Sequence, residues 1–368
     1  MNKQALLAII GVLAVVGLGG AIWATSSNSD TTENTNSTDN ENISIITTLY
    51  PQYDFTRTIA PDAEVELLLP AGTEPHSYEP TPRDIEAIQN TDLFIYTGEA
   101  MEPWVKDILN NVSEDRVLDL SSSITLMQSD HSHDHEEEDH SHSDDHDHDH
   151  DHEDGHSHDE HGDDHSHEEE HSHDHEEKVK DEMHEDHDHK HGEYDPHFWL
   201  DFTNAVTMVE TISTKLSEID SSNADTYSTN SQALITDLEA LDTKYETTLS
   251  QCEENTLIIA GHSAFGYLTE RYGLTQEAAQ GFSPNAEPSS SRVVELIELV
   301  NEKDAGAVFT EELLSDRLAQ TISDETGAQV LQITPAGNVT RDDLDANVTF
   351  IDIMESNLES FATGLSCN

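Results

Sequence analysis

Cysteine is nearly absent from this chain of 368 residues, which contains only Cys252 and Cys367. Two thiols cannot form a disulfide-dense scaffold, and they are too few for a Cys-rich zinc module. If the chain is exported, it reaches a compartment that permits oxidation, and we then expect the two cysteines to form one disulfide. Two free thiols are the alternative.

Basic residues are scarce as well: 15 lysines and arginines stand against 78 acidic residues, which gives a formal net charge of −63 at pH 7. Such a surface repels the phosphates of nucleic acids and of anionic lipids. Residues 130–192 contain 28 of the acidic residues, so the rest of the chain is acidic too. We therefore expect no nucleic-acid partner.

The first 24 residues carry Lys3 as their one charged side chain, and residues 5–24 form an uncharged run. Twenty such residues can cross a bilayer as a helix, but a cleaved signal peptide has a similar pattern, and both remain open. No cysteine follows the run, which argues against a bacterial-type lipid anchor. Residues 25–42 are typical of a flexible tether. We expect the folded part outside the cytoplasmic membrane, either exported or anchored to its outer face.

The remaining sequence alternates short apolar runs with amphipathic stretches, which predicts an α/β fold with parallel βαβ units. Thr81 followed by Pro82 marks the clearest helix start. Residues 201–251 contain no Gly or Pro and predict one or two helices, the last of them long and bridging. The predicted strands are 43–46, 65–69, 93–96 and 117–120 in a first series and 257–260, 307–309 and 330–333 in a second.

These patterns predict seven parts along the chain. They are a signal peptide or membrane anchor at 1–24, the tether at 25–42, an N-terminal α/β lobe at 43–129, a disordered acidic His-rich loop at 130–192, the end of the first lobe at 193–222, a bridging helix at 223–252 and a C-terminal α/β lobe at 253–368.

Histidine is concentrated in one segment, because 21 of the 24 lie within residues 130–192 and leave only His76, His197 and His262. Each of these three lies in a Gly- or Pro-bounded loop near a strand or helix end. Ligands of open α/β sheets bind beyond the carboxyl ends of strands, so the three could converge between the lobes. Neutral imidazoles suit Zn²⁺, whereas Mn²⁺ prefers more carboxylates. For any single His, a structural or surface role is the alternative.

Residues 130–192 combine imidazoles and carboxylates but have almost no apolar side chains, so they cannot form a core of their own. Their composition predicts a loop that collects metal ions at several weak sites. A solvated spacer with incidental histidines is the alternative.

Three motifs occur in order: Gly72-x-x-Pro75-His76-x-Tyr78-Glu79-Pro80, Asp195-Pro196-His197-x-Trp199-Leu200-Asp201 and His262-x-Ala264-Phe265-Gly266-Tyr267. With them, residues 43–367 resemble the zinc- and manganese-specific substrate-binding proteins of ABC importers. The resemblance implies two parallel-sheet α/β lobes joined by one long rigid helix, with the metal in the cleft between them. It also implies His76, His197 and His262 as metal ligands, and a permease with its ATPase as partners. His262 favours zinc, since manganese members usually have a carboxylate there.

The fourth ligand is left open by a departure from the family pattern. Many members have Asp-Pro-Leu where residues 334–337 read Thr-Pro-Ala-Gly. Water is our first choice and Glu74 the second. Asp195 either orients a ligand or caps the loop or helix beside it.

Three alternatives stand beside zinc delivery by a monomeric binding protein. They are a manganese-binding homologue, a metal-binding surface adhesin and a mononuclear zinc hydrolase, in which three His and a zinc-bound water of pKa about 7 would form the site. Outside residues 130–192 the sequence has no His-Glu-x-x-His motif, and no obvious general base stands beside the ligands, so we expect no enzymatic activity.

Overall fold

The computed structural model describes residues 42–128, 194–285 and 287–368. The predicted export segment 1–24, the tether apart from residue 42, and the His-rich loop 130–192 lie outside the described residues. Within the described ranges, no helix is both long and apolar enough to cross a membrane.

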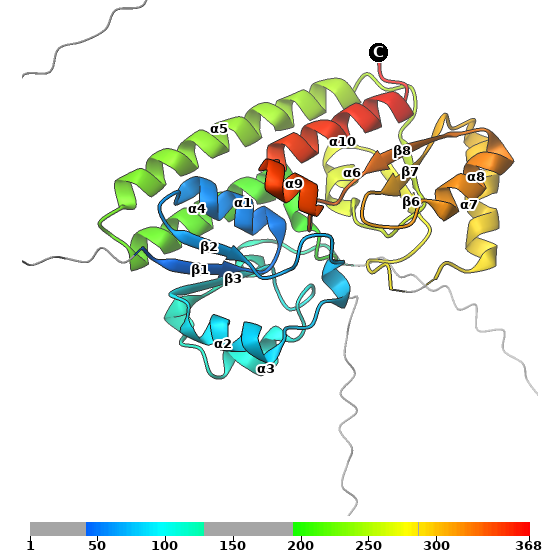
Figure 1. The fold of residues 1–368 in the computed structure, drawn as a ribbon. Coiled ribbons are helices and arrows are strands. Elements are labelled where there is room, and N and C mark those ends of the chain that lie inside the picture. Colours follow the sequence, from blue (N-terminus) through cyan, green and yellow to red (C-terminus); the bar gives the residue numbers. More distant parts are fainter. Residues whose placement is uncertain (1–41, 129–193, 286) are drawn as a thin grey trace, which may run out of the picture. The chain divides into compact units, whose positions relative to one another are not determined.

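The first lobe is built on a sheet of four parallel strands in the order β2-β1-β3-β4. Helices α1 and α4 lie over one face of this sheet and α2 and α3 over the other (Figure 1). Helix α2 begins at the predicted place, because the Thr81 side chain accepts a hydrogen bond from the Asp84 amide. The elements are β1 (Ser44–Thr47), α1 (Tyr50–Ile59), β2 (Glu64–Leu67), η1 (Pro75–Ser77), α2 (Pro82–Asn90), β3 (Leu93–Tyr96), α3 (Val105–Leu109), η2 (Glu114–Arg116), β4 (Val117–Asp119) and η3 (Leu120–Ser123).

After η4 (Phe198–Leu200), two helices follow, α4 (Phe202–Ile219) and α5 (Ala224–Leu249). Helix α5 has 26 residues, which corresponds to a length of about 39 Å. It packs against α1 and α4 of the first lobe and against α6 and α10 of the second. Figure 1 shows α5 running along both lobes, so it is the long bridging helix that the sequence predicts.

The second lobe has its own sheet of four parallel strands, in the order β6-β5-β7-β8. Strand β6 was not predicted, because its sequence Thr-Gln-Glu-Ala lacks an apolar run. The expected disulfide joins Cys252, just after α5, to Cys367 at the end of the chain. The elements are β5 (Thr256–Ile259), α6 (Gly266–Tyr272), β6 (Thr275–Ala278), α7 (Ser290–Lys303), β7 (Ala307–Glu311), α8 (Arg317–Thr326), β8 (Gln329–Ile333), α9 (Arg341–Ala346) and α10 (Phe350–Gly364).

One hydrophobic core runs through both lobes and sets their relative position. Phe55 of α1, Tyr245 of α5 and Phe361 of α10 are fully buried members of this core. The Tyr245 ring packs edge-on against Phe202, with 5.0 Å between ring centroids, and also against Phe361. Because the lobes share packed side chains, the loops between them are held on a rigid frame. The predicted fold of two parallel-sheet α/β lobes joined by a long helix is confirmed.

Candidate metal centre

The structure brings His76, His197 and His262 together from three separate loops. His76 lies in η1, in the loop that follows β2, and His262 lies just after β5, so both come from the carboxyl ends of strands. His197 directly precedes η4. The Nε2 atom of His197 lies 3.1 Å from Nε2 of His76 and 3.2 Å from Nε2 of His262.

The spacing of these nitrogens suits a single tetrahedral ion. Two nitrogens bound to one Zn²⁺ at 2.0–2.1 Å with tetrahedral angles lie about 3.3–3.4 Å apart. The two Nε2 distances are slightly shorter than this, and one ligand atom from each of the three residues falls within 4.8 Å of the others. A small outward movement of the rings would admit the ion.

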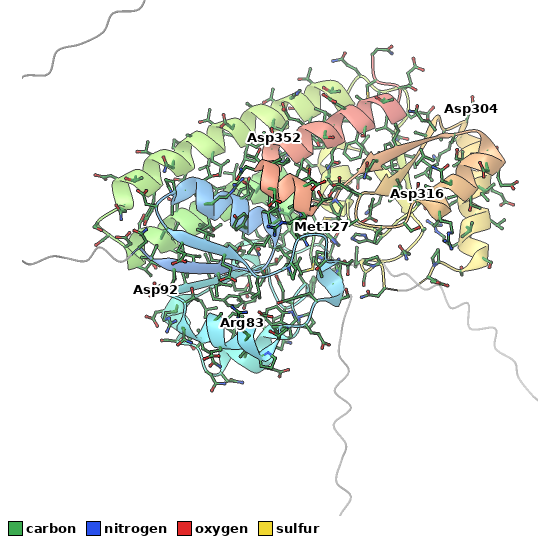
Figure 2. The ribbon with its side chains drawn as sticks, in the orientation of Figure 1. Arg83, Asp92, Met127, Asp304, Asp316 and Asp352 are labelled. Carbon is green, nitrogen blue, oxygen red and sulfur yellow. A yellow bond between two sulfur atoms is a disulfide. The ribbon has the colours of Figure 1, made fainter. Side chains whose placement is uncertain are left out.

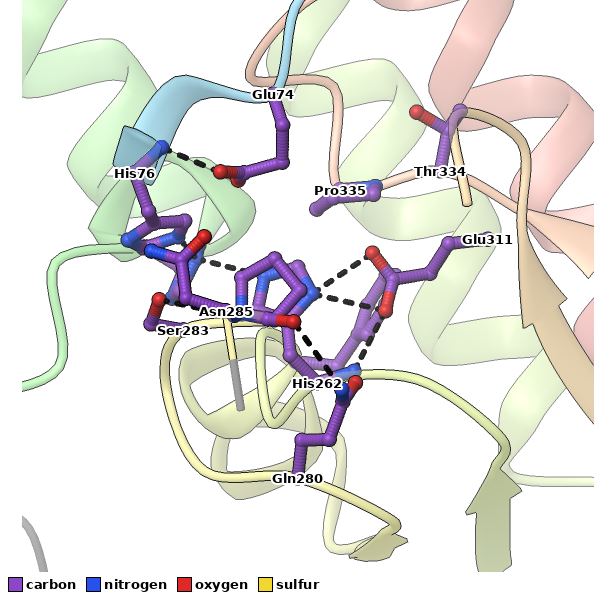
Figure 3. Close-up of polar contacts among 12 residues, drawn as sticks. Glu74, His76, His262, Gln280, Ser283, Asn285, Glu311, Thr334 and Pro335 are labelled. Carbon is purple, nitrogen blue, oxygen red and sulfur yellow. Dashed lines mark hydrogen bonds and ion pairs between the residues drawn. The ribbon is translucent and has the colours of Figure 1, made fainter. Parts of the chain in front are cut away.

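Two buried carboxylates fix which ring nitrogens face the centre of the site. Oδ1 of Asp195 lies 2.7 Å from Nδ1 of His197, and Oε1 of Glu311 lies 2.8 Å from Nδ1 of His262. A carboxylate accepts, so each Nδ1 carries the proton and donates, and each Nε2 is left with its lone pair. Each carboxylate also accepts the backbone N–H of the same histidine. Figure 3 shows the Glu311 contacts.

Burial keeps the imidazoles of His76 and His197 neutral. His197 and His262 are 1% and 3% exposed, and His76 is partly exposed. Burial, reinforced by the neighbouring histidines, lowers the pKa of His76 and of His197 well below the ordinary value. The facing lone pairs of His197 and His262, 3.2 Å apart, repel one another, and a cation between them turns this repulsion into attraction. The donor set therefore fits a divalent metal that prefers nitrogen ligands.

The cavity around the three rings is small. Its volume is about 30 Å³, whereas a buried water needs roughly 10–15 Å³, so there is room for an ion with one water and little else. Glu74 lines the cavity, but its carboxylate accepts the backbone N–H groups of His76 and Ser77 and thereby caps η1. Figure 3 shows the Glu74 carboxylate turned toward the His76 amide.

Two glycines make room for the orienting carboxylates. A Cβ atom at Gly261 would lie 2.0 Å from Oε1 of Glu311, and one at Gly266 would lie 2.7 Å from Oδ2 of Asp195. The spacing of the His262 motif thus reflects close packing against carboxylates from elsewhere in the chain. Glu311 was missed by the sequence reasoning, and the signal available was a charged residue at the end of the buried strand β7.

Residues 334–338 of the second lobe hold the loop that leads to His76. The Asn338 side chain, 2% exposed, donates hydrogen bonds of 2.8 Å to the carbonyl oxygens of Pro70 and Thr73. In the same segment, the Pro335 carbonyl accepts a 2.7 Å hydrogen bond from the indole of Trp199. This segment therefore contacts the His76 loop and the His197 segment.

Comparison with known proteins places this chain in a family. The family model described as "Zinc-uptake complex component A periplasmic" matches residues 45–364. The zinc-binding lipoprotein AdcA of Streptococcus pneumoniae is 34% identical over 319 residues, which are 86% of this chain and 55% of that protein. The high-affinity zinc uptake system protein ZnuA of Bacillus subtilis is 32% identical over 328 residues, 88% of each chain.

The fold agrees with these matches. The Zn(II)-bound ZnuA-like domain of Streptococcus pneumoniae AdcA has a TM-score of 0.64 and 30% sequence identity, over 88% of this chain and 99% of that one. The chain spans about half the length of AdcA but most of the Bacillus protein. The resemblance expected from the three motifs is confirmed, and the chain belongs to the family of zinc-uptake complex component A.

Proposed function

We propose that this chain captures Zn²⁺ outside the cytoplasmic membrane and delivers it to an ABC permease driven by an ATPase. The observation that supports this most strongly is the convergence of three Nε2 atoms, of His76, His197 and His262, in one small cavity. The printed names of AdcA and of the Bacillus ZnuA describe zinc binding and zinc uptake. They support the same cargo here.

The fourth position on the ion is assigned to a water molecule, with Glu74 as the alternative. Both oxygens of Glu74 are engaged by backbone N–H groups of η1, so ligation by this carboxylate would cost those hydrogen bonds. Asp195 and Glu311 are turned to the Nδ1 atoms and act as orienting groups.

Transport, and not hydrolysis, is the role we assign to the bound zinc. Three histidines and a water also describe a catalytic zinc, and such a site needs a group that accepts the proton of the attacking water. The two carboxylates nearest the ligand rings are committed to the Nδ1 atoms. Esterase or CO₂-hydration activity of the zinc-loaded protein would contradict the assignment.

The test is a metal titration of the purified protein and of His262→Ala. The wild type should bind one tight Zn²⁺, and the variant should lose orders of magnitude in affinity because two protein donors remain. Thr256→Val is the matched control, since Thr256 is buried at the start of strand β5, the strand that precedes His262. An unchanged dissociation constant for His262→Ala would refute the site.

A further inference from the structure

Helix α6 connects the two lobes beside the metal centre through side chains whose role the proposed site does not explain. It begins at Gly266, four residues after His262, and carries Tyr267 and Arg271 at positions i and i+4. Residues with this spacing lie on one face of a helix. Both of them contact the segment 195–201, which carries His197.

Tyr267 holds the beginning of that segment. Its hydroxyl donates a 3.1 Å hydrogen bond to the Asp195 carbonyl and accepts a 2.8 Å bond from the Met127 amide. The Asp195 amide in turn donates to the Met127 carbonyl at 2.9 Å. Met127 is labelled in Figure 2. One buried hydroxyl, on a side chain 4% exposed, thus binds two separate chain segments of the first lobe to the second.

Arg271 holds the end of the segment. Its guanidinium lies 3.2 Å from Oδ1 of Asp201, the residue that caps α4, and also pairs with Asp242 of the bridging helix. Between these two attachments lie His197 and the whole of η4. The segment is therefore pinned at both ends to the helix that follows His262.

We propose that Tyr267 and Arg271 are positioning residues for metal capture, which set His197 against His262 before the ion arrives. This inference rests on the proposed function. A ligand pair that is held in place loses less conformational entropy on binding than one that must be ordered. Removing either attachment lets the His197 segment move relative to His262. Neither Tyr267 nor Arg271 contacts the ion itself, so the effect on the ion passes through Asp195 and His197.

The decisive variant is Tyr267→Phe, which keeps the ring and removes the hydroxyl. Zn²⁺ affinity, measured by competition with a chelator, should fall about 10-fold, as for other groups that orient ligands from outside the coordination sphere. The loss should appear mainly as faster transfer of zinc to excess chelator. The visible absorption of the Co²⁺-loaded variant should also change, because it reports the ligand geometry and not global stability.

The matched control is Tyr227→Phe. Tyr227 is also 4% exposed, and its hydroxyl donates to Asp220 between α4 and α5, away from the segment 195–201. Its zinc affinity and Co²⁺ spectrum should equal those of the wild type. A Tyr267→Phe affinity within twofold of the wild type would overturn the inference, and so would an equal loss in both variants, which indicates general destabilisation.

A second pair of variants tests the proposal if the Tyr267→Phe protein does not fold. Arg271→Met should weaken zinc binding in the same direction, and Arg292→Met is its control. Arg292 has a similar exposure, 32% against 27%, and pairs with Glu277 and Glu295 inside the second lobe. Equal affinities of Arg271→Met and the wild type would overturn the inference. His262→Ala, titrated in parallel, separates the two failures: if it too binds zinc normally, the proposed site itself is wrong.

Discussion

Replacing Glu311 by Gln tests whether the orienting carboxylate contributes to metal affinity. Gln has nearly the same shape and retains an oxygen that can accept from Nδ1 of His262, so the substitution removes the charge and little else. Glu311 is 4% exposed and accepts two hydrogen bonds from His262, at 2.7 Å from the backbone amide and 2.8 Å from Nδ1. The amide contact exists with or without metal, whereas a ring N–H becomes a stronger donor once Nε2 binds a cation.

The magnitude follows from that difference. A hydrogen bond to a charged group contributes about 1.5–3 kcal/mol and a neutral one about 1 kcal/mol. The strengthening on metal binding is therefore lost in Glu311→Gln, and zinc affinity should fall about 10- to 100-fold, the range typical of groups that orient metal ligands.

Competition with a chelator of known affinity is the assay, and Glu312→Gln is the control. Glu312 is the next residue along the chain and does not line the metal cavity. Its variant should bind zinc like the wild type. If Glu311→Gln binds zinc within twofold of the wild type, the orienting role is wrong and His262 is held by packing alone.

Two further predictions concern pH and the His-rich segment. Burial raises the pKa of Asp195 to about 7, and zinc binding favours its ionised form. Binding therefore releases a proton, and zinc affinity should fall about tenfold per pH unit below pH 7. Isothermal titrations between pH 7.5 and 6 check this, and a pH dependence that persists in Asp195→Asn would contradict it. Deleting residues 130–192 should leave the tight site intact, since its three ligands lie elsewhere, and should remove the more weakly bound metal ions. If metal analysis finds the same total stoichiometry in the full-length and the deleted protein, the segment is only a spacer.

The strands other than β6, and the bridging helix, could be predicted from the sequence because their apolar patterns are local. A helix after the first strand was expected from the alternating pattern, but the bounds of α1 were not, because its buried positions include Gln52, Asp54 and Thr56 among the apolar ones. Two of these polar groups have distant partners: Gln52 donates to the Thr97 hydroxyl, 45 residues away, and Asp54 accepts the backbone N–H of Phe350, 296 residues away. Such pairings depend on the tertiary fold and leave no periodic signal.

The three histidines stood out by composition, since they alone lie outside the His-rich segment. Their orienting groups did not stand out equally. Asp195 is two residues from His197, so its partnership is local, whereas Glu311 lies 49 residues after His262. Only the parallel pairing of β5 with β7 brings that carboxylate to the ring. In a chain with 78 acidic residues, a charged residue at the end of a buried strand is a weak signal until its neighbours in space are known.

Because carboxylates are so abundant in this chain, a site whose three proposed protein ligands are all nitrogen atoms is informative about metal choice. Oxygen-tipped side chains cover the outside of both lobes in Figure 2, and Mn²⁺ would prefer such donors. Yet the two carboxylates nearest the ligand rings accept hydrogen bonds from Nδ1–H groups, and the missing side chains of Gly261 and Gly266 leave the space that these carboxylates occupy. Turning either toward the ion would break two hydrogen bonds to its histidine. The orienting arrangement that fixes the Nε2 lone pairs therefore also withholds oxygen ligands, which favours Zn²⁺ over Mn²⁺.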